Sequence, residues 1–185
     1  MGRDTLVKEF KGRHDHKDYI KRGIRTENLF IDESIKLGYR VKVASDSQNM
    51  SDHIDLILTK GDKKFTVDVK ARRTGTDKSK GFDDLWTVVE FKNTMGDSGW
   101  LYSKSDYIAF ERKEDFVFAD TKQLRDMCES IVDVTKRVAS FRNANYKVWG
   151  RSYQGKKDLI SRIEMFKVVE LNKTFIWLKN LDNNE

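Results

Sequence analysis

Two short runs of apolar and β-branched residues flank a polar turn within residues 53–73, HIDLILTKGDKKFTVDVKARR, and the rest of the chain is organised around this stretch. Residues 54–59 and 64–71 are rich in β-branched and apolar side chains, and the KGDK segment between them is typical of a turn. The pattern predicts a two-stranded β-hairpin. If its loop is symmetric, the numbers of facing residues add up to 123, so that Asp55 faces Asp68.

The facing aspartates make the hairpin chemically unusual. With a two-residue loop they form a non-hydrogen-bonded pair, whose Cα atoms lie roughly 4.5 Å apart. Like charges directly opposite one another are destabilising, so the pair needs a compensating cation. The two-residue period of a strand also places Lys70 on the face that carries Asp68. The hairpin therefore predicts a metal site with an ammonium group beside it.

A helix is predicted before the hairpin, over residues 19–37. Four isoleucines from Ile20 to Ile35 recur at helical spacing, and Gly38 follows them as a helix-ending glycine. Glu27 lies within this apolar stripe, where a buried acid is costly unless it is paired or bound to metal. Glu27 is therefore either a peripheral glutamate paired with an arginine or a member of the metal site.

The remaining pattern predicts further strands and helices in one domain, with a core over about residues 19–131 and an extension over 132–185. The fold class expected is α/β with a mixed central sheet flanked by helices. The expected elements are strands at 39–45, 86–91 and 146–151, a polar loop at 46–51, a hairpin of 106–111 and 116–119, a helix that Asp120 caps and that buries Cys128, and a helix or strand at 156–171.

Composition narrows the class of protein without fixing it. Of 185 residues, 38% are hydrophobic and 36% charged, with a net charge of +6. The basic balance permits a polyanionic partner such as nucleic acid, although a solvated surface of mixed charge explains it equally well. The single cysteine excludes an internal disulfide and fits a reducing compartment. We find no signal peptide and no membrane span, and therefore expect a cytoplasmic protein.

Glu27, Asp55, Asp68 and Lys70 have the chemistry that phosphodiester hydrolysis requires. A hard divalent cation held by carboxylates activates water and offsets charge on phosphate oxygens, and Mg²⁺ prefers a few carboxylates plus water. A nearby ammonium can orient the water or stabilise the developing charge. The sequence contains no P-loop and no GxGxxG, CxxC, HExxH or GxSxG motif, so the alternative chemistries lack their residues.

The spacing of Asp55 and the triplet Asp68–Val69–Lys70 resembles the PD-(D/E)XK nuclease superfamily, in particular its small phage or bacterial members. The resemblance implies a restriction-endonuclease-like αβββαβ core and an Mg²⁺ or Mn²⁺ site. It also implies metal ligation by Asp55, Asp68 and the main-chain carbonyl of Val69, with Lys70 acting on the attacking water. A helix glutamate matches Glu27. The chain departs from the family where Ile54 precedes the first acid and where Asp68 replaces the commoner glutamate.

Two other acidic or basic features belong to this interpretation. Glu90 is an additional acid that could act as a supplementary metal ligand. The loop RRTGTDKSKG follows the hairpin, and its charges Arg72, Arg73, Lys78 and Lys80 are expected to contact a phosphate backbone.

The function expected is a divalent-metal-dependent endo- or exodeoxyribonuclease acting on DNA. A homodimer would suit double-strand cleavage. One alternative is a catalytically inactive module that binds nucleic acid or protein on the same fold. Another is a structural protein in which Asp55 and Asp68 make only surface salt bridges.

Overall fold

The computed structural model describes residues 17–73, 83–150, 155 and 157–179, and the chain forms two compact units. The first unit is built from Met1–Arg72, Ser105–Phe118 and Ile176–Glu185, and the second from Arg73–Lys104 and Ala119–Phe175. Each unit is assembled from separate stretches of sequence. For this reason no single linker marks the division between them.

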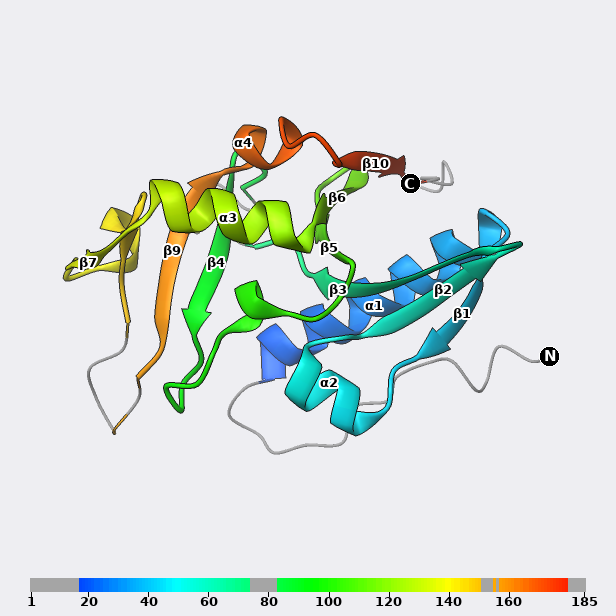
Figure 1. Cartoon of the computed structure of the whole chain (residues 1–185), viewed down its shortest axis with the longest axis horizontal. Coiled ribbons are helices and arrows are strands. Elements are labelled where there is room, and N and C mark those ends of the chain that lie inside the picture. The colour runs from blue at the N-terminus through cyan, green and yellow to red at the C-terminus, as the bar shows by residue number, and fades with distance from the viewer. Residues whose placement is uncertain (1–16, 74–82, 151–154, 156, 180–185) are drawn as a thin grey trace. The chain divides into compact units, whose positions relative to one another are not determined.

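A six-stranded mixed sheet dominates the first unit (Figure 1). Its order is β1-β2-β3-β5-β6-β10, with β1, β2 and β3 antiparallel and β3 parallel to β5. This arrangement confirms the mixed α/β class. The elements concerned are α1 (Lys17–Lys36), β1 (Arg40–Val43), α2 (Asp46–Asp52), β2 (Leu56–Lys60), β3 (Lys63–Lys70), β5 (Tyr107–Glu111), β6 (Asp115–Asp120) and β10 (Phe175–Leu178).

The order of elements departs from αβββαβ after the third strand. A helix followed by an antiparallel three-stranded meander is present as expected. Between β3 and β5, however, the described residues contain β4 (Trp86–Lys92) and the 3₁₀ helix η4 (Trp100–Tyr102), and no α-helix. The next long helix, α3 (Thr121–Ile131), follows β6 instead. The αβββαβ order expected through about residue 131 is therefore wrong in this part of the chain.

Helix α1 ends as predicted, although its buried face differs from the expected one. Gly38 adopts a φ of 82°, which suits glycine, and Tyr39 N–H donates to the Ser34 carbonyl at 3.0 Å. Phe30 is fully buried, whereas Ile35 is 46% exposed. The isoleucine pattern therefore predicted the wrong buried face for the last turn of α1. The core contacts the face that carries Phe30 and Ser34.

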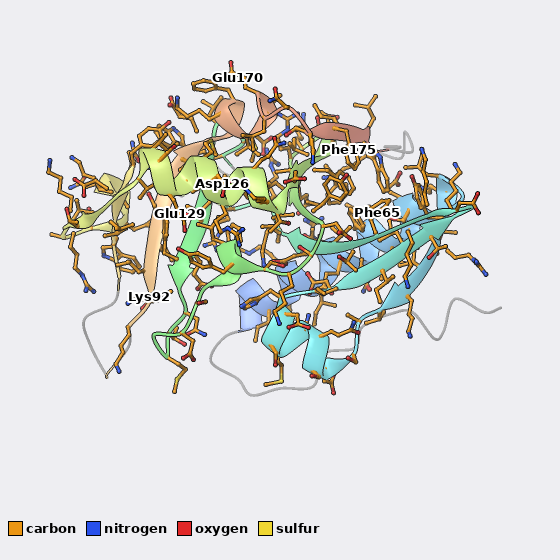
Figure 2. The ribbon with its side chains drawn as sticks, in the orientation of Figure 1. Phe65, Lys92, Asp126, Glu129, Glu170 and Phe175 are labelled. Atoms are coloured by element: carbon orange, nitrogen blue, oxygen red, sulfur yellow. The ribbon has the colours of Figure 1, made fainter. Side chains whose placement is uncertain are left out.

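Aromatic side chains fill the core of the first unit. The Phe30 ring centroid lies 5.0 Å from that of Phe116 and 5.8 Å from that of Trp177 on β10. Phe65 of β3, labelled in Figure 2, packs edge-on against Tyr107 at 5.5 Å. Such pairs add to the stabilisation from apolar burial, so α1, the hairpin and β10 are held by one cluster.

The polar segment expected as a loop at 46–51 is helix α2, so that prediction was wrong. Ser45 caps the helix: its side chain accepts from Gln48 N–H at 3.3 Å, while the Gln48 side chain accepts from Ser45 N–H at 3.1 Å. This reciprocal capping box satisfies two backbone donors that would otherwise lack partners. It allows a seven-residue helix to form with no buried side chain of its own.

In the second unit, β4 pairs antiparallel with β9, and β7 pairs parallel with β8. Asp120 caps α3 through Gln123 N–H at 3.0 Å and Cys128 is fully buried, as expected. The segment expected as helix or strand is both in succession. Among the described residues, no helix is long and apolar enough to cross a membrane.

The remaining elements are β7 (Asp133–Arg137), η5 (Phe141–Asn143), β8 (Lys147–Val148), β9 (Leu159–Glu164) and α4 (Met165–Val169). Strand β8 is shorter than the strand expected at 146–151.

Candidate active site

The hairpin has the predicted register. The pairs run from Lys60 opposite Lys63 to Leu56 opposite Val67, which is the ladder of a two-residue loop. Gly61 in that loop has a φ of 56°, a conformation that glycine adopts without strain. The ladder places the two aspartates at its far end, one residue beyond the last pair.

Asp55 sits just outside the ladder, against the strand that carries Asp68. Its N–H donates to the Val67 carbonyl at 3.0 Å, and its Oδ2 accepts from Val69 N–H at 2.8 Å. The Asp55 carboxylate thus binds the backbone N–H of the residue that follows Asp68, and it is near enough to raise the pKa of the Asp68 carboxyl group. Asp55 is 8% exposed and Asp68 2% exposed, so the pair is buried.

The ammonium of Lys70 completes this cluster, 2.6 Å from Asp68 Oδ1. Burial raises the pKa of Asp68 to about 8; Lys70 opposes the shift, and the neighbouring Asp55 adds to it. The other oxygen, Asp68 Oδ2, is buried and accepts no hydrogen bond from the described residues. An oxygen in that position favours a proton or a cation, because a buried charge needs a partner.

Helix α2 holds Asp55 in place through a residue that the sequence analysis missed. Asn49 Nδ2 donates to Asp55 Oδ1 at 2.6 Å. The helix ends at His53, whose φ of 51° reverses the chain direction, and Ile54 N–H donates to the Gln48 carbonyl at 3.2 Å. The Ser45–Gln48 capping box could have indicated this residue, since it predicts a helix that contains Asn49 and ends just before Asp55.

Of the other predicted ligands, Val69 adjoins this pair on β3, whereas Glu27 lies on α1 and Glu90 on β4. No group of three or more His, Cys, Asp or Glu in the described part of the chain is placed to hold a metal ion. Glu27 is half-buried on α1, and its convergence with Asp55 and Asp68 stays a prediction. Glu90 lies on β4 in the second unit, where its Oε2 accepts from Trp100 N–H at 3.4 Å. Val69 is buried beside Asp68, with its N–H bound to Asp55.

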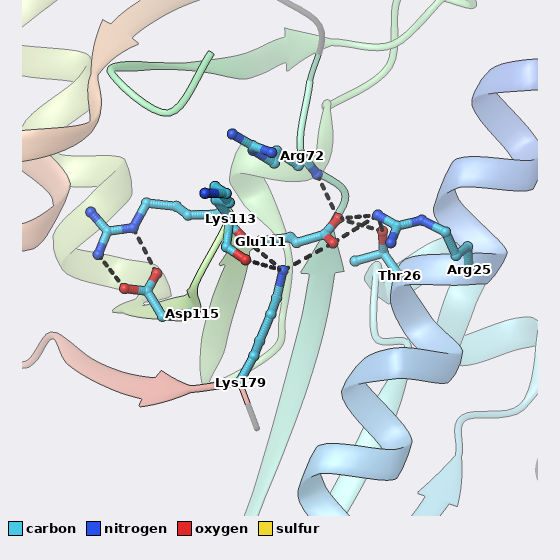
Figure 3. A network of polar contacts seen from close by, with 8 residues as sticks. Arg25, Thr26, Arg72, Glu111, Lys113, Asp115 and Lys179 are labelled. Carbon is cyan, nitrogen blue, oxygen red and sulfur yellow. Dashed lines mark hydrogen bonds and ion pairs between the residues drawn. The ribbon is translucent and has the colours of Figure 1, made fainter. Parts of the chain in front are cut away.

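A second buried carboxylate, Glu111, lies at the end of β5 and was also missed (Figure 3). It accepts from Arg25 Nη2 at 2.7 Å, Thr26 Oγ1 at 2.6 Å, Arg72 N–H at 3.0 Å and Lys179 Nζ at 3.2 Å. Burial alone would raise the pKa of Glu111, but these hydrogen bonds and cations outweigh it and lower the pKa. Glu111 thereby fixes the chain two residues after Lys70.

The predicted phosphate-binding loop is described only at its start. The Arg72 side chain is half-buried and that of Arg73 is exposed. Lys78 and Lys80 lie outside the described residues.

Comparisons with protein-family models, with curated proteins and with solved structures gave no significant match. Any functional assignment therefore depends on the side chains and contacts given above.

Proposed function

We propose that this protein is a metal-dependent hydrolase. More particularly, we propose a nuclease that cleaves DNA phosphodiester bonds, on the pattern of the PD-(D/E)XK superfamily. The observation that carries the proposal is the buried pair Asp55 and Asp68: Asp55 binds Val69 N–H at 2.8 Å, and the Lys70 ammonium lies 2.6 Å from Asp68. A fold has no structural need for two neighbouring buried acids, since like charges repel and each is costly to bury.

The donor set fits a small divalent cation. Asp68 Oδ2 is a buried oxygen that accepts no hydrogen bond from the described residues, and carboxylate oxygens are the ligands that Mg²⁺ and Mn²⁺ prefer. Asp55, Asp68 and the Val69 carbonyl would hold the ion. When bound, it would supply a Lewis acid that lowers the pKa of water and offsets charge on the phosphate.

The residues around the pair have distinct tasks under this proposal. Lys70 orients the attacking water and stabilises charge that develops on the phosphate oxygens. Asn49 and Val69 N–H fix the two oxygens of Asp55, which keeps the carboxylate oriented toward Asp68. Glu27 on α1 is the proposed additional acid, and Glu90 a supplementary one.

DNA is the proposed partner, with Arg72, Arg73, Lys78 and Lys80 contacting its backbone. Each of these side chains would add to affinity without selecting a sequence. A homodimer would allow both strands of a duplex to be cut. Such an enzyme would act in the cytoplasm, and in that of the host if a phage encodes it.

One observation favours a second candidate, an inactive nucleic-acid- or protein-binding module. No third metal-binding side chain joins Asp55 and Asp68 within the described ranges, so the site has fewer ligands than a dedicated metal centre. A module of this kind would retain the aspartate pair as a remnant and would bind its partner without turnover.

A cleavage assay with a separate metal-binding measurement tests the proposal. The full chain is incubated with linear, circular, single-stranded and branched DNA in Mg²⁺ or Mn²⁺, and Mn²⁺ binding is followed by calorimetry. Lys70→Ala should abolish cleavage and retain metal binding, whereas Asp68→Asn should weaken both. The matched control Lys64→Ala removes an exposed lysine from the same strand and should change neither.

Two results would contradict the nuclease. Metal binding without cleavage of any DNA form would favour the inactive module. No metal binding at all would leave the aspartate pair without the proposed role.

A further inference from the structure

The positive charge of the chain is concentrated in one segment, residues 134–157. This segment holds seven lysines and arginines and no aspartate or glutamate. Without them, the 36 basic residues of the chain fall to 29, against 30 acidic ones. The net charge of +6 therefore comes from these 24 residues alone, and the rest of the chain is close to neutral.

The described basic side chains of this segment all face solvent. Lys136 and Arg137 lie on β7, whose five residues are all exposed, Arg142 lies on η5, Lys147 begins β8, and Lys157 precedes β9. Figure 1 shows β7 at one end of the second unit, and β7 pairs with β8, which contacts β9. One acid lies among these bases: Asp133 begins β7 and faces Lys147 across the β7–β8 pair, so the exposed bases of these elements outnumber the acids without excluding them.

Backbone hydrogen bonds join the described part of this segment to β9. Arg162 N–H donates to the Ala144 carbonyl at 2.9 Å, and Trp149 and Ile160 exchange backbone hydrogen bonds at 2.9 and 2.8 Å. Gly150 approaches Asp158 so closely that a Cβ atom there would lie 1.8 Å from the Asp158 carbonyl oxygen. No other residue fits this position without moving the backbone.

A buried arginine on β9, Arg162, contacts two residues of the same segment. Arg162 is 7% exposed, and its guanidinium stacks on Phe141 at 5.7 Å while donating to Asn145 Oδ1 at 3.0 Å. The same group also stacks on Trp86 at 4.9 Å. These contacts hold the side chains of Phe141 and Asn145, which lie on either side of Arg142 in the sequence.

We propose that the exposed basic side chains of β7, η5 and β8, represented by Lys136, Arg142 and Lys147, form a nucleic-acid-binding surface that contacts the phosphate backbone. The surface lies wholly in the second unit, whereas Asp55, Asp68 and Lys70 belong to the first. It deepens the proposed function, on which it rests only for the identity of the partner. It binds by charge, so affinity depends on salt more than on base sequence.

Binding is measured by anisotropy of labelled single-stranded and duplex oligonucleotides over about 50–200 mM salt, a range in which phosphate contacts change affinity strongly. EDTA is present throughout, so that no cleavage occurs. Arg142→Ala/Lys147→Ala should flatten the slope of log affinity against log salt by up to about 1.8 on duplex and about 1.4 on single strands. The form that the wild type binds with the higher affinity at the same salt concentration is the preferred partner.

The matched control is Lys63→Ala/Lys64→Ala, which removes the same charge from exposed positions of the hairpin and should leave the slope unchanged. Arg142→Lys keeps the charge and should also bind as wild type does. Thermal melts verify folding. If the double variant is unfolded, Lys147→Gln alone should remove about half of the change in slope.

An unchanged slope in the folded double variant would overturn the inference, and so would an equal loss in the hairpin control. Binding to phosphatidylserine vesicles without binding to either oligonucleotide would also overturn it, and would identify an anionic membrane surface instead. The proposed nuclease is tested separately. Suppose that the wild type cleaves no DNA, and that Lys70→Ala still binds oligonucleotides in a salt-dependent way. This result would support the nucleic-acid-binding surface and contradict the proposed nuclease activity.

Discussion

Asp68 carries its proton into the neutral pH range, which makes its mutation informative about its role. The pKa of this carboxyl is raised from 3.8 to about 8 by burial. Since the folded state binds this proton more tightly than the unfolded state, stability falls as pH rises between those two values. Asp68→Asn resembles the protonated acid, so it should remove this slope and remain within about 1 kcal/mol of wild type at pH 7.

Thermal melts of wild type and Asp68→Asn from acid to mildly alkaline pH, each with EDTA and with Mn²⁺, check this expectation. Mn²⁺ should raise the melting temperature of wild type more than that of the variant. If Asp68 served only as a structural partner of Lys70, its loss would instead cost about 3–5 kcal/mol at neutral pH.

Cys128 should be chemically inert in the folded protein. It is fully buried on α3, and burial raises the pKa of its thiol to about 12. Only the thiolate reacts readily with alkylating agents, so labelling by iodoacetamide at pH 8 should be far slower in native buffer than in denaturant. Rapid labelling of the native protein would mean that α3 opens easily.

At the scale of elements, the short helix α2 should determine how firmly the Asp55 carboxylate is oriented for metal binding. The Ser45 cap stabilises a helix whose Asn49 binds Asp55 at 2.6 Å. Ser45→Ala should cost about 1 kcal/mol of stability and should weaken Mn²⁺ binding, because the Asp55 carboxylate loses a fixed partner. Melts and calorimetric titration of the variant measure both effects.

Ser47→Ala is the matched control for this cap. Ser47 is exposed in the first turn of the same helix, so its replacement should leave metal affinity unchanged. Equal effects of the two substitutions would show that α2 has no part in orienting Asp55.

Local sequence patterns predicted the hairpin correctly, but they missed a helix that has a capping box and no apolar periodicity. The register of the β2–β3 hairpin followed from the two-residue turn, because a period of two leaves little freedom once the loop is fixed. Helix α2 was missed, even though Ser45 and Gln48 spell its cap, because a helix without apolar residues lacks the usual periodic signal. Residues 156–171 fitted neither period because β9 changes to α4 at Met165.

At the scale of the molecule, Glu111 ties segments that are far apart in sequence. Its carboxylate joins α1, the backbone after β3 and Lys179, the residue after β10. Glu111→Gln should therefore cost about 3 kcal/mol, since it leaves two cations with a weaker acceptor. Denaturant unfolding at neutral pH measures this loss.

The pH dependence of that loss identifies its cause. The pKa of Glu111 is lowered from 4.5, so its contribution is present above that value and disappears as pH falls through the folded-state pKa. Wild type and Glu111→Gln should converge in stability in acid. Glu114→Gln, an exposed acid in the adjacent turn, should behave as wild type throughout.

Long-range partners are what the sequence could not supply. Thr26 and Glu111 are 85 residues apart, and nothing local to either indicates the other. The parallel pairing of β3 with β5 is equally invisible, because its register is fixed by packing and by no turn. The predicted third carboxylate, Glu27, stays a prediction for the same reason: the helical stripe places it on α1 without fixing which face of α1 meets the sheet.

The position of β10 has a consequence for biosynthesis. The sheet of the first unit begins with strands from residues 40–70 and is completed by Phe175–Leu178, whose Trp177 packs on Phe30. A ribosome that has made the first three strands has therefore not yet made the one that covers β6. During translation the nascent sheet presents an open edge and an unfilled aromatic core, the kind of surface that chaperones recognise.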